Sequence, residues 1–294
     1  MTTVLAEPVV DRRQIIGGSD ISAILGISPW QTPYQLWLEK TSEQPIEEDP
    51  KKATFFRRRK MMESYVIELA REEHDLNVVA RNARYYDPSC SIMSCEVDFE
   101  HEWEKRIENA DVKTVHPVMA KQWGAPGTDE IPQYYTAQFL WGQMITERDS
   151  TLCMAMIGLD KLEPYRVKRD EALIHWMREQ ALRFWELVEK KTPPEITTLE
   201  DAKLAWRREQ PAKQVVATSE ILAIAERLAL MKKGVVGRLA EADLLELDLK
   251  KFMGNAEEMV DPQGERVLTW KTQAKKSYTV AASESRVMRL AGRD

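Results

Sequence analysis

The spacing of apolar residues near the N-terminus predicts short helices. Residues 17–41 contain two such segments, separated by a turn. Ser19 is a candidate N-cap for the first helix, and Gly26 supplies a stop signal. Thr32 and Pro33 give the second helix a cap and a proline at its first position. We therefore expect two helices joined by a turn.

The middle of the chain changes between helical and strand periodicity. Apolar residues three or four positions apart predict helices, and short runs rich in β-branched and aromatic residues predict strands. The expected helices cover 53–74, 131–146 and 169–192, after a loop at 42–52. The expected strands cover 76–86, 92–99, 106–115, 151–158 and 165–168. A charged stretch around His101 is expected to separate the second strand from the third. Helices that flank a central sheet give an α/β or α+β architecture.

The composition shifts beyond the prolines at 193–194. Apolar positions from 219 to 252 step by three and four and form a single stripe, which must pack on the core, on a second copy or on a partner. Residues 261–264 predict a turn between two short strands, and hence a terminal β-hairpin. We expect a core domain at 1–215 and a helical extension with a hairpin at 216–294.

Charge and composition narrow the class of protein. The chain has 294 residues and a net charge of −6, so it lacks the overall positive charge typical of polyanion binders. An enzyme that cuts phosphodiesters still fits, because a local basic track and an acidic metal centre cancel in the total. No apolar run approaches the roughly 18 residues of a membrane span, so we expect a cytoplasmic protein without a membrane partner. Three cysteines and four scattered histidines argue against a disulfide framework or a structural zinc site.

Acidic residues and one lysine mark consecutive predicted strands. Asp98 ends one strand, and Asp111 and Lys113 lie two positions apart in the next, so alternation places them on one face. Two aspartates on adjacent strands can share Mg²⁺, while Lys113 can stabilise an attacking hydroxide. Glu63, on the preceding helix, can complete the acidic cluster. The alternative is that these are solvated charges at strand ends, although charges inside a strand usually need partners.

A basic run precedes Glu63 on the same predicted helix. It consists of Arg57, Arg58, Arg59 and Lys60. These four side chains spread around most of a helix, so two or more can face a phosphate backbone. The alternative is an ordinary solvated helix face.

Two further groups are candidates for contacts with phosphate. Arg12 and the turn at 17–19 offer a guanidinium, a hydroxyl and backbone N–H groups to an anion, although the same turn is also an ordinary helix start. Gln138 lies one turn from Tyr134 and Tyr135 and can contact a phosphate or a metal-bound water. Aromatic residues at such spacing more often belong to the core.

These motifs occur in a recognisable order. They are IIGGSDISAILGISPWQTPYQLWLEKT at 15–41, RRRKMMES with Glu63, the strand residue Asp98, the triplet Asp111-Val112-Lys113, and IP-x-x-Y-x-x-Q from Ile131 through Tyr135 to Gln138. The first block and the order that follows closely resemble the YqaJ-type viral recombinase family, which also contains phage lambda exonuclease. The resemblance covers about residues 12–195.

The resemblance implies a fold and an activity. The core at 1–215 would be a PD-(D/E)xK nuclease with a restriction-endonuclease-like fold, in which helices flank a central mixed β-sheet. The protein would degrade one strand from a duplex DNA end in the 5′ to 3′ direction and produce single-stranded DNA for phage-type homologous recombination. It would act in a bacterial host cell as a phage or prophage protein, as a ring-shaped trimer, with a single-strand annealing recombinase as partner.

The resemblance also implies roles for individual residues. Two Mg²⁺ ions are expected, with Mn²⁺ as an alternative ion. Asp98, Asp111 and the Val112 backbone carbonyl would bind metal, and Glu63 would serve the second ion or its water shell. Lys113 would act on the nucleophilic water, and Gln138 would lie near the scissile phosphate. Arg12 and Ser19 would hold the 5′-terminal phosphate, and the residues in contact with DNA would be Arg57, Arg58, Arg59, Lys60 and Tyr135.

The sequence departs from the family's pattern at three positions. Val97 replaces the usual proline, Asp111 replaces the commoner glutamate, and Glu96 stands where a small polar residue often lies beside the 5′-phosphate pocket. A carboxylate at position 96 would repel a terminal phosphate unless it points away, so the strand polarity depends on the surroundings of this side chain. Two other functions stay open: an endonuclease on the same core, and a non-catalytic DNA-end binding or recombinase-loading scaffold.

Overall fold

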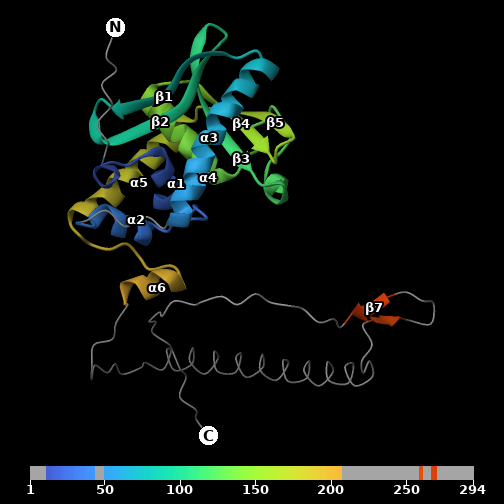
Figure 1. Ribbon diagram of the computed structural model, residues 1–294. Coiled ribbons are helices and arrows are strands. Elements are labelled where there is room, and N and C mark those ends of the chain that lie inside the picture. Colours follow the sequence, from blue (N-terminus) through green and yellow to red (C-terminus); the bar gives the residue numbers. More distant parts are fainter. Residues whose placement is uncertain (1–10, 44–49, 207–257, 261–265, 270–294) are drawn as a thin grey trace. The chain divides into compact units, whose positions relative to one another are not determined.

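The structure, a computed structural model, describes residues 11–43, 50–206, 258–260 and 266–269 (Figure 1). The chain divides into two compact units, Met1–Ala202 and Lys203–Asp294. In the second unit, β6 (Glu258–Val260) and β7 (Arg266–Thr269) pair antiparallel, which confirms the predicted hairpin. The predicted boundary at 215 and the apolar stripe at 219–252 lie outside the described residues and stay predictions.

Five strands of the first unit form one mixed sheet, ordered as in the chain. They are β1 (Asn77–Asp87), β2 (Cys90–Trp103), β3 (Arg106–Val115), β4 (Ser150–Ile157) and β5 (Lys161–Lys168). Neighbouring strands are antiparallel except β3 and β4, which run parallel. A parallel pair needs a long crossover connection, and here a helix supplies it.

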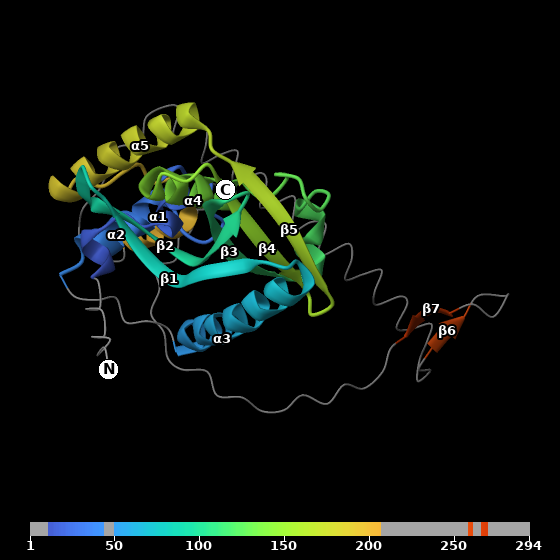
Figure 2. The same cartoon turned by 90° about the horizontal axis from the view of Figure 1, so that it is seen from above.

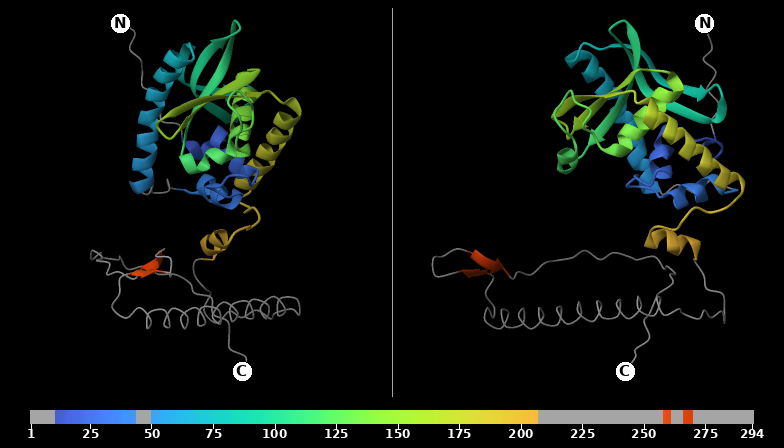
Figure 3. Two further views of the ribbon diagram at one scale, coloured as in Figure 1. Left: turned by 90° about the vertical axis from the view of Figure 1, so that its right-hand side faces the viewer. Right: turned by 180° about the vertical axis from the view of Figure 1, so that it is seen from behind.

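Helices cover both faces of the sheet. They are α1 (Gly18–Ile24), α2 (Pro33–Thr41), α3 (Pro50–Glu73), α4 (Gln133–Thr146), α5 (Glu171–Glu189) and α6 (Leu199–Ala205), with the short 3-10 helices η1 (Arg12–Gln14) and η2 (Pro117–Gln122). α3 lies along one face, and α4, α1 and α5 lie on the other (Figures 2 and 3). None of the described helices is both long and apolar enough to cross a membrane. The predicted α/β fold, a central mixed sheet flanked by helices, is confirmed.

Alternation along the central strands divides the core into two layers. Ala110 and Met154 belong to the apolar cluster under α3, together with Val66 of that helix. The intervening Cys153 belongs to the cluster on the opposite face, which contains Trp141 of α4. Residues 109, 111 and 113 of β3 therefore face α4, because successive side chains point to opposite faces.

β2 is longer than the sequence pattern predicts. The stretch around His101, expected to separate two strands, belongs to β2 as far as Trp103 and pairs with β3, and Glu100 and His101 within it are buried. Its buried polar side chains have partners from other elements: His101 Nε2 lies 2.8 Å from Glu108 Oε2, and Arg148 Nη2 lies 3.3 Å from Glu100 Oε1. Burial of charge is tolerated where such partners exist, and a local pattern does not show them.

The sheet forks between β2 and β3. The two strands pair from Trp103 and Arg106 as far as Phe99 and Ala110. Beyond that pair β3 continues alongside β4, while β2 takes a new neighbour from the N-terminal segment. Ile16 donates its N–H to the Ile92 carbonyl at 2.6 Å and accepts the Ser94 N–H at 3.0 Å. The fork therefore brings the N-terminal segment beside the ends of two strands.

Candidate active site at the fork of the sheet

Asp98 lies where β2 and β3 separate. Its Oδ2 accepts a hydrogen bond from the Val112 N–H at 2.9 Å. The carboxylate thus satisfies a backbone donor of β3 just past the last β2–β3 pair, where an unpaired N–H would be costly. This hydrogen bond holds the Asp98 carboxylate against β3, next to Asp111.

Asp111 and Lys113 form an ion pair on the face of β3 that packs against α4. This confirms the prediction that alternation places them together. The Lys113 ammonium lies 4.9 Å from the centre of the Tyr135 ring and 5.5 Å from that of Phe139. Gln138 Nε2 donates to Asp111 Oδ2 at 3.3 Å. Residues of α4 at one-turn spacing therefore hold both members of the pair.

The carboxylates at the fork act on one another electrostatically. Burial raises the pKa of Asp111 to about 7; the Lys113 ammonium opposes this rise, and the charges of Asp98 and Glu63 add to it. Burial and the Asp98 charge likewise raise the pKa of Glu63 above its usual range. Burial alone would lower the pKa of Lys113, but the charges of Asp111 and Asp98 raise it, so the ammonium keeps its proton.

The carboxylates of Glu63, Asp98 and Asp111 lie near one another but do not form a preformed metal-binding site. Within the described part of the chain, no three His, Cys, Asp or Glu side chains converge closely enough to hold an ion together. Asp98 is engaged by a backbone N–H, and Asp111 by Lys113 and Gln138. A ligand of this site would therefore need a rearrangement of side chains.

A cavity of about 260 Å³ opens at the fork, and we call it the fork cavity. Its polar lining includes Arg12, Ser19, Arg84, Glu96, Asp111 and Gln138, and the backbone of Gly17 and Gly18 also lines it. Addition of a Cβ at Gly18 would place it 3.3 Å from the Gln138 side chain, so the glycine permits a close approach of α1 to α4. Arg12 and Ser19, predicted to hold a phosphate, thus share one space with Asp111 and Gln138, whereas Glu63, Asp98 and Lys113 do not line it.

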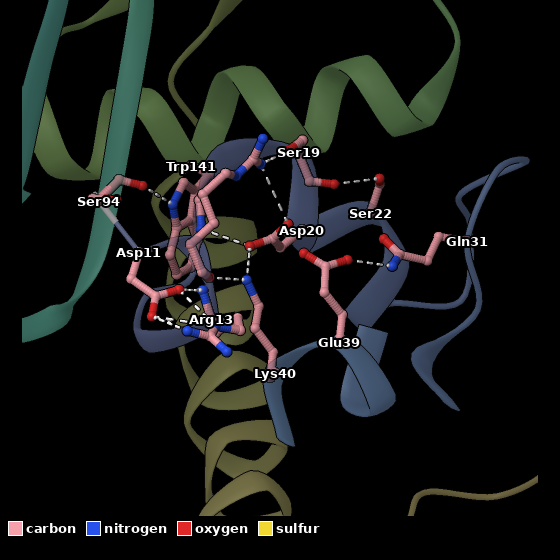
Figure 4. A network of polar contacts seen from close by, with 12 residues as sticks. Asp11, Arg13, Ser19, Asp20, Ser22, Gln31, Glu39, Lys40, Ser94 and Trp141 are labelled. Atoms are coloured by element: carbon pink, nitrogen blue, oxygen red, sulfur yellow. Dashed lines mark hydrogen bonds and ion pairs between the residues drawn. The ribbon is translucent and has the colours of Figure 1, made fainter. Parts of the chain in front are cut away.

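A buried ion pair fixes the N-terminal wall of the fork cavity (Figure 4). Lys40 Nζ donates to Asp20 Oδ2 at 2.7 Å and to the Arg12 carbonyl at 2.6 Å, and the Lys40 side chain is fully buried. Asp20 also accepts the Gly17 N–H at 3.0 Å. Sequence reasoning missed Asp20 and Lys40, although the spacing of Asp20 three residues after Gly17 is typical of a capping residue.

Ser19 does not have the capping role that the sequence suggested. The N-cap of α1 is Gly17, and the carboxylate of Asp20 bonds its N–H. Ser19 instead accepts a hydrogen bond from Arg12 Nη2 at 2.7 Å. Because Gly17 has already capped the helix, the Ser19 hydroxyl turns to the guanidinium that lines the fork cavity.

The basic run on α3 is exposed, and two of its members reach the site. Arg59 bonds both the carbonyl and the hydroxyl of Thr114, the residue after Lys113. Lys60 Nζ lies 2.8 Å from Glu63 Oε1 and 2.5 Å from Asn82 Oδ1. Burial disfavours the charged form of Lys60, but Glu63 raises its pKa above the ordinary value.

Arg57 and Arg58 are exposed on α3. Tyr135 is half-buried, and its ring contacts Lys113, as described above, and Trp123 at 5.7 Å between centroids. DNA contacts by these three residues, and metal binding by the Val112 carbonyl, stay predictions.

Sequence reasoning also missed Arg84. It lies opposite Glu96 in the β1–β2 register, and its guanidinium is 2.5 Å from Glu96 Oε2. Strand register could not be known from the sequence, so no local signal linked the two residues. The Glu96 carboxylate, marked above as a departure from the family pattern, therefore has a cationic partner.

Comparisons with known proteins point to one family. Residues 9–149 match the sequence model of the YqaJ-like viral recombinase domain. The uncharacterized protein YqaJ of Bacillus subtilis (strain 168) is 30% identical over 181 residues, which are 61% of this chain and 54% of that protein, so the match spans about half of the relative's length.

Two solved structures are also similar in part. An alkaline exonuclease from Laribacter hongkongensis has a TM-score of 0.48 and 13% identity, covering 62% of this chain and 91% of its own. A phage related exonuclease from Haemophilus somnus has a TM-score of 0.45 and 13% identity, covering 60% of this chain and 94% of its own.

The family match spans the whole of the fork, from Arg12 in the N-terminal segment to Gln138 on α4. The resemblance that the sequence motifs indicated is thereby confirmed: residues 9–149 match the YqaJ-like viral recombinase domain.

Proposed function

We propose that the protein is a metal-dependent DNA exonuclease that acts on duplex ends and produces single-stranded DNA for phage-type recombination. One observation carries the proposal. Asp111 lines the same cavity as Arg12 and Ser19. Lys113 pairs with Asp111, and Asp98 accepts the N–H of the next residue, Val112. Carboxylates and a lysine suit hydrolysis of a phosphodiester, and a guanidinium with a hydroxyl suits an adjoining terminal phosphate. The family match supports a role in recombination.

The donor set suits a hard divalent cation. Carboxylate oxygens are the ligands that Mg²⁺ prefers, and the mutual repulsion of Glu63, Asp98 and Asp111 calls for positive charge among them. We propose that Asp98, Asp111 and the Val112 carbonyl hold one Mg²⁺ ion and that Glu63 serves a second, with Mn²⁺ as a substitute. When bound, the ions would supply an activated water and neutralise charge on the phosphate.

The protein's own residues would do the positioning. Lys113 is buried beside aromatic rings and keeps its proton, so its ammonium can stabilise a hydroxide or the charge that develops on the phosphate. Gln138 donates to Asp111 and so orients this carboxylate. The buried pair of Lys40 with Asp20 holds the backbone of Arg12, which fixes the distance between the terminal phosphate and the carboxylates.

The proposal also includes assembly. By family resemblance the protein would form a trimer and work with a single-strand annealing recombinase, and the exposed arginines of α3 would follow the DNA backbone. The intact set of Glu63, Asp98, Asp111 and Lys113 favours a catalyst over a scaffold.

The first prediction tests the activity. With Mg²⁺ the wild type should degrade linear duplex and spare covalently closed circular duplex, and EDTA should stop the reaction. Asp98→Ala, Asp111→Ala and Lys113→Ala should each reduce cleavage by more than a hundredfold, on the order of the effect of losing one charge-stabilising group, while DNA binding is kept. Strand-resolved gels with end-labelled DNA measure both.

A matched control is Asp149→Ala, which removes an exposed carboxylate paired with Arg106 far along β3 from the fork. It should cut as the wild type does. Turnover within tenfold of wild type in any of the three site variants would remove that residue from catalysis. Cleavage of circular DNA would identify an endonuclease, and binding without cleavage a scaffold.

The second prediction concerns strand polarity. A linear duplex with 5′-phosphates should be degraded faster than the same duplex with 5′-hydroxyls, because Arg12 and Ser19 would bind the phosphate dianion. The ratio of the two rates should fall toward one in Arg12→Ala and stay unchanged in Arg106→Ala, which alters an exposed guanidinium outside the fork cavity. Equal wild-type rates, or earlier loss of the 3′-ended strand, would contradict 5′ to 3′ polarity.

The third prediction concerns pH. A metal ion binds the ionised form of Asp111, whose pKa is raised to about 7, so protons should compete with the metal below that pH. Mg²⁺ affinity should fall by up to roughly tenfold per pH unit below pH 7 and level off above it. Calorimetry in two buffers of different ionisation enthalpy measures affinity and proton release together. Equal affinity at pH 6 and pH 8, with no proton released, would show that Asp111 is not a ligand.

A further inference from the structure

Arg84 is a cation of the fork cavity to which the family motifs assign no role. It comes from β1, lines the cavity together with Arg12 and Ser19, and has a side chain that is 25% exposed. Glu96 accepts from one of its terminal nitrogens at 2.5 Å. A guanidinium has five N–H donors in a planar fork, so one short bond to a carboxylate leaves most of them available to a ligand.

Glu96 holds cations on both of its oxygens. Oε2 meets Arg84, and Oε1 lies 3.9 Å from Lys60 Nζ. The carboxylate that would repel a phosphate if it stood alone is thus matched by two positive charges from β1 and α3. The position of Glu96 at the cavity wall is therefore compatible with an anion in the cavity.

The ion pair of Arg81 with Glu68 is a structural comparison for Arg84 on the same strand, β1. Arg81 lies three residues before Arg84, and its guanidinium is 2.5 Å from Glu68 Oε1 on α3. It does not line the fork cavity. Half-exposed pairs of this kind contribute little to stability, so stability alone does not account for the placement of Arg84 at the wall of a polar cavity.

We propose that Arg84, oriented by Glu96, is a second guanidinium ligand for the terminal phosphate and makes the fork cavity selective for DNA ends. This inference rests on the proposed function. A terminal phosphate carries about −1.5 to −2 charges and three free oxygens, whereas an internal phosphodiester carries one charge. Two guanidinium groups therefore match the terminal group better than an internal one, which favours exonuclease over endonuclease action.

The test measures binding without cleavage. Fluorescence anisotropy in EDTA gives the affinity for duplex oligonucleotides with a 5′-phosphate or a 5′-hydroxyl, and inorganic phosphate serves as competitor. The wild type should prefer the phosphorylated end, and phosphate should abolish the preference. Arg84→Gln should reduce the preference by roughly tenfold or more, the range for a charge-assisted bond to phosphate. Arg81→Gln, which alters an ion pair of the same length on the same strand, should keep it.

Arg84→Lys covers the case in which Arg84→Gln fails to fold. It retains the charge beside Glu96 but lacks the planar fork, and it should lose several-fold of the preference. An unchanged preference in the Arg84 variants, or a wild type without any preference, would overturn the inference. The proposed nuclease is judged separately, by Mg²⁺-dependent cleavage of linear DNA by the wild type, so the two can fail independently.

Discussion

The separation of β2 from β3 beyond Phe99 and Ala110 is the constraint on which the rest of the site depends. A strand that leaves its neighbour exposes backbone donors and acceptors, and these need new partners. The Asp98 carboxylate takes the Val112 N–H, and the Ile16 backbone takes the free edge of β2. One backbone requirement thus draws a carboxylate and the N-terminal segment to the same place.

The repulsion among the carboxylates at the fork is a second constraint on the site. Three carboxylates approach one another at the fork, and burial raises the pKa values of two of them, Asp111 and Glu63. Two lysines counter this charge, Lys113, buried on the same strand as Asp111, and Lys60, exposed on α3. Burial of ion pairs is an expensive way to stabilise a fold, which favours a functional reason for their presence.

Much of this was visible in the sequence. The bounds of β3 were predicted as observed, because its alternation is regular, and the same alternation placed Asp111 with Lys113. β2 was predicted too short, because the partners of its buried charges come from distant elements such as Arg148. Local patterns report periodicity and capping, and they do not report which distant charge neutralises another.

The same limit applies to the candidate site. Strand ends and alternation singled out Asp98 and Asp111, and motif order added weight to Gln138. Lys40 and Arg84 were missed because each acts on a residue brought to it by the fold. Glu96 was recognised as unusual, but its effect could not be judged without the register of β1 and β2. Motifs predicted the chemistry of the site, and the strand register showed the charges that surround Glu96.

The most direct test of this account is to locate a divalent cation in the protein. Crystals soaked in Mn²⁺, whose anomalous scattering marks its position, should show an ion between the carboxylates of Asp98 and Asp111, and Asp111→Asn should weaken or abolish that peak. An ion bound only elsewhere, or an equal peak in Asp111→Asn, would contradict the claim that the fork of the sheet is the metal-dependent active site.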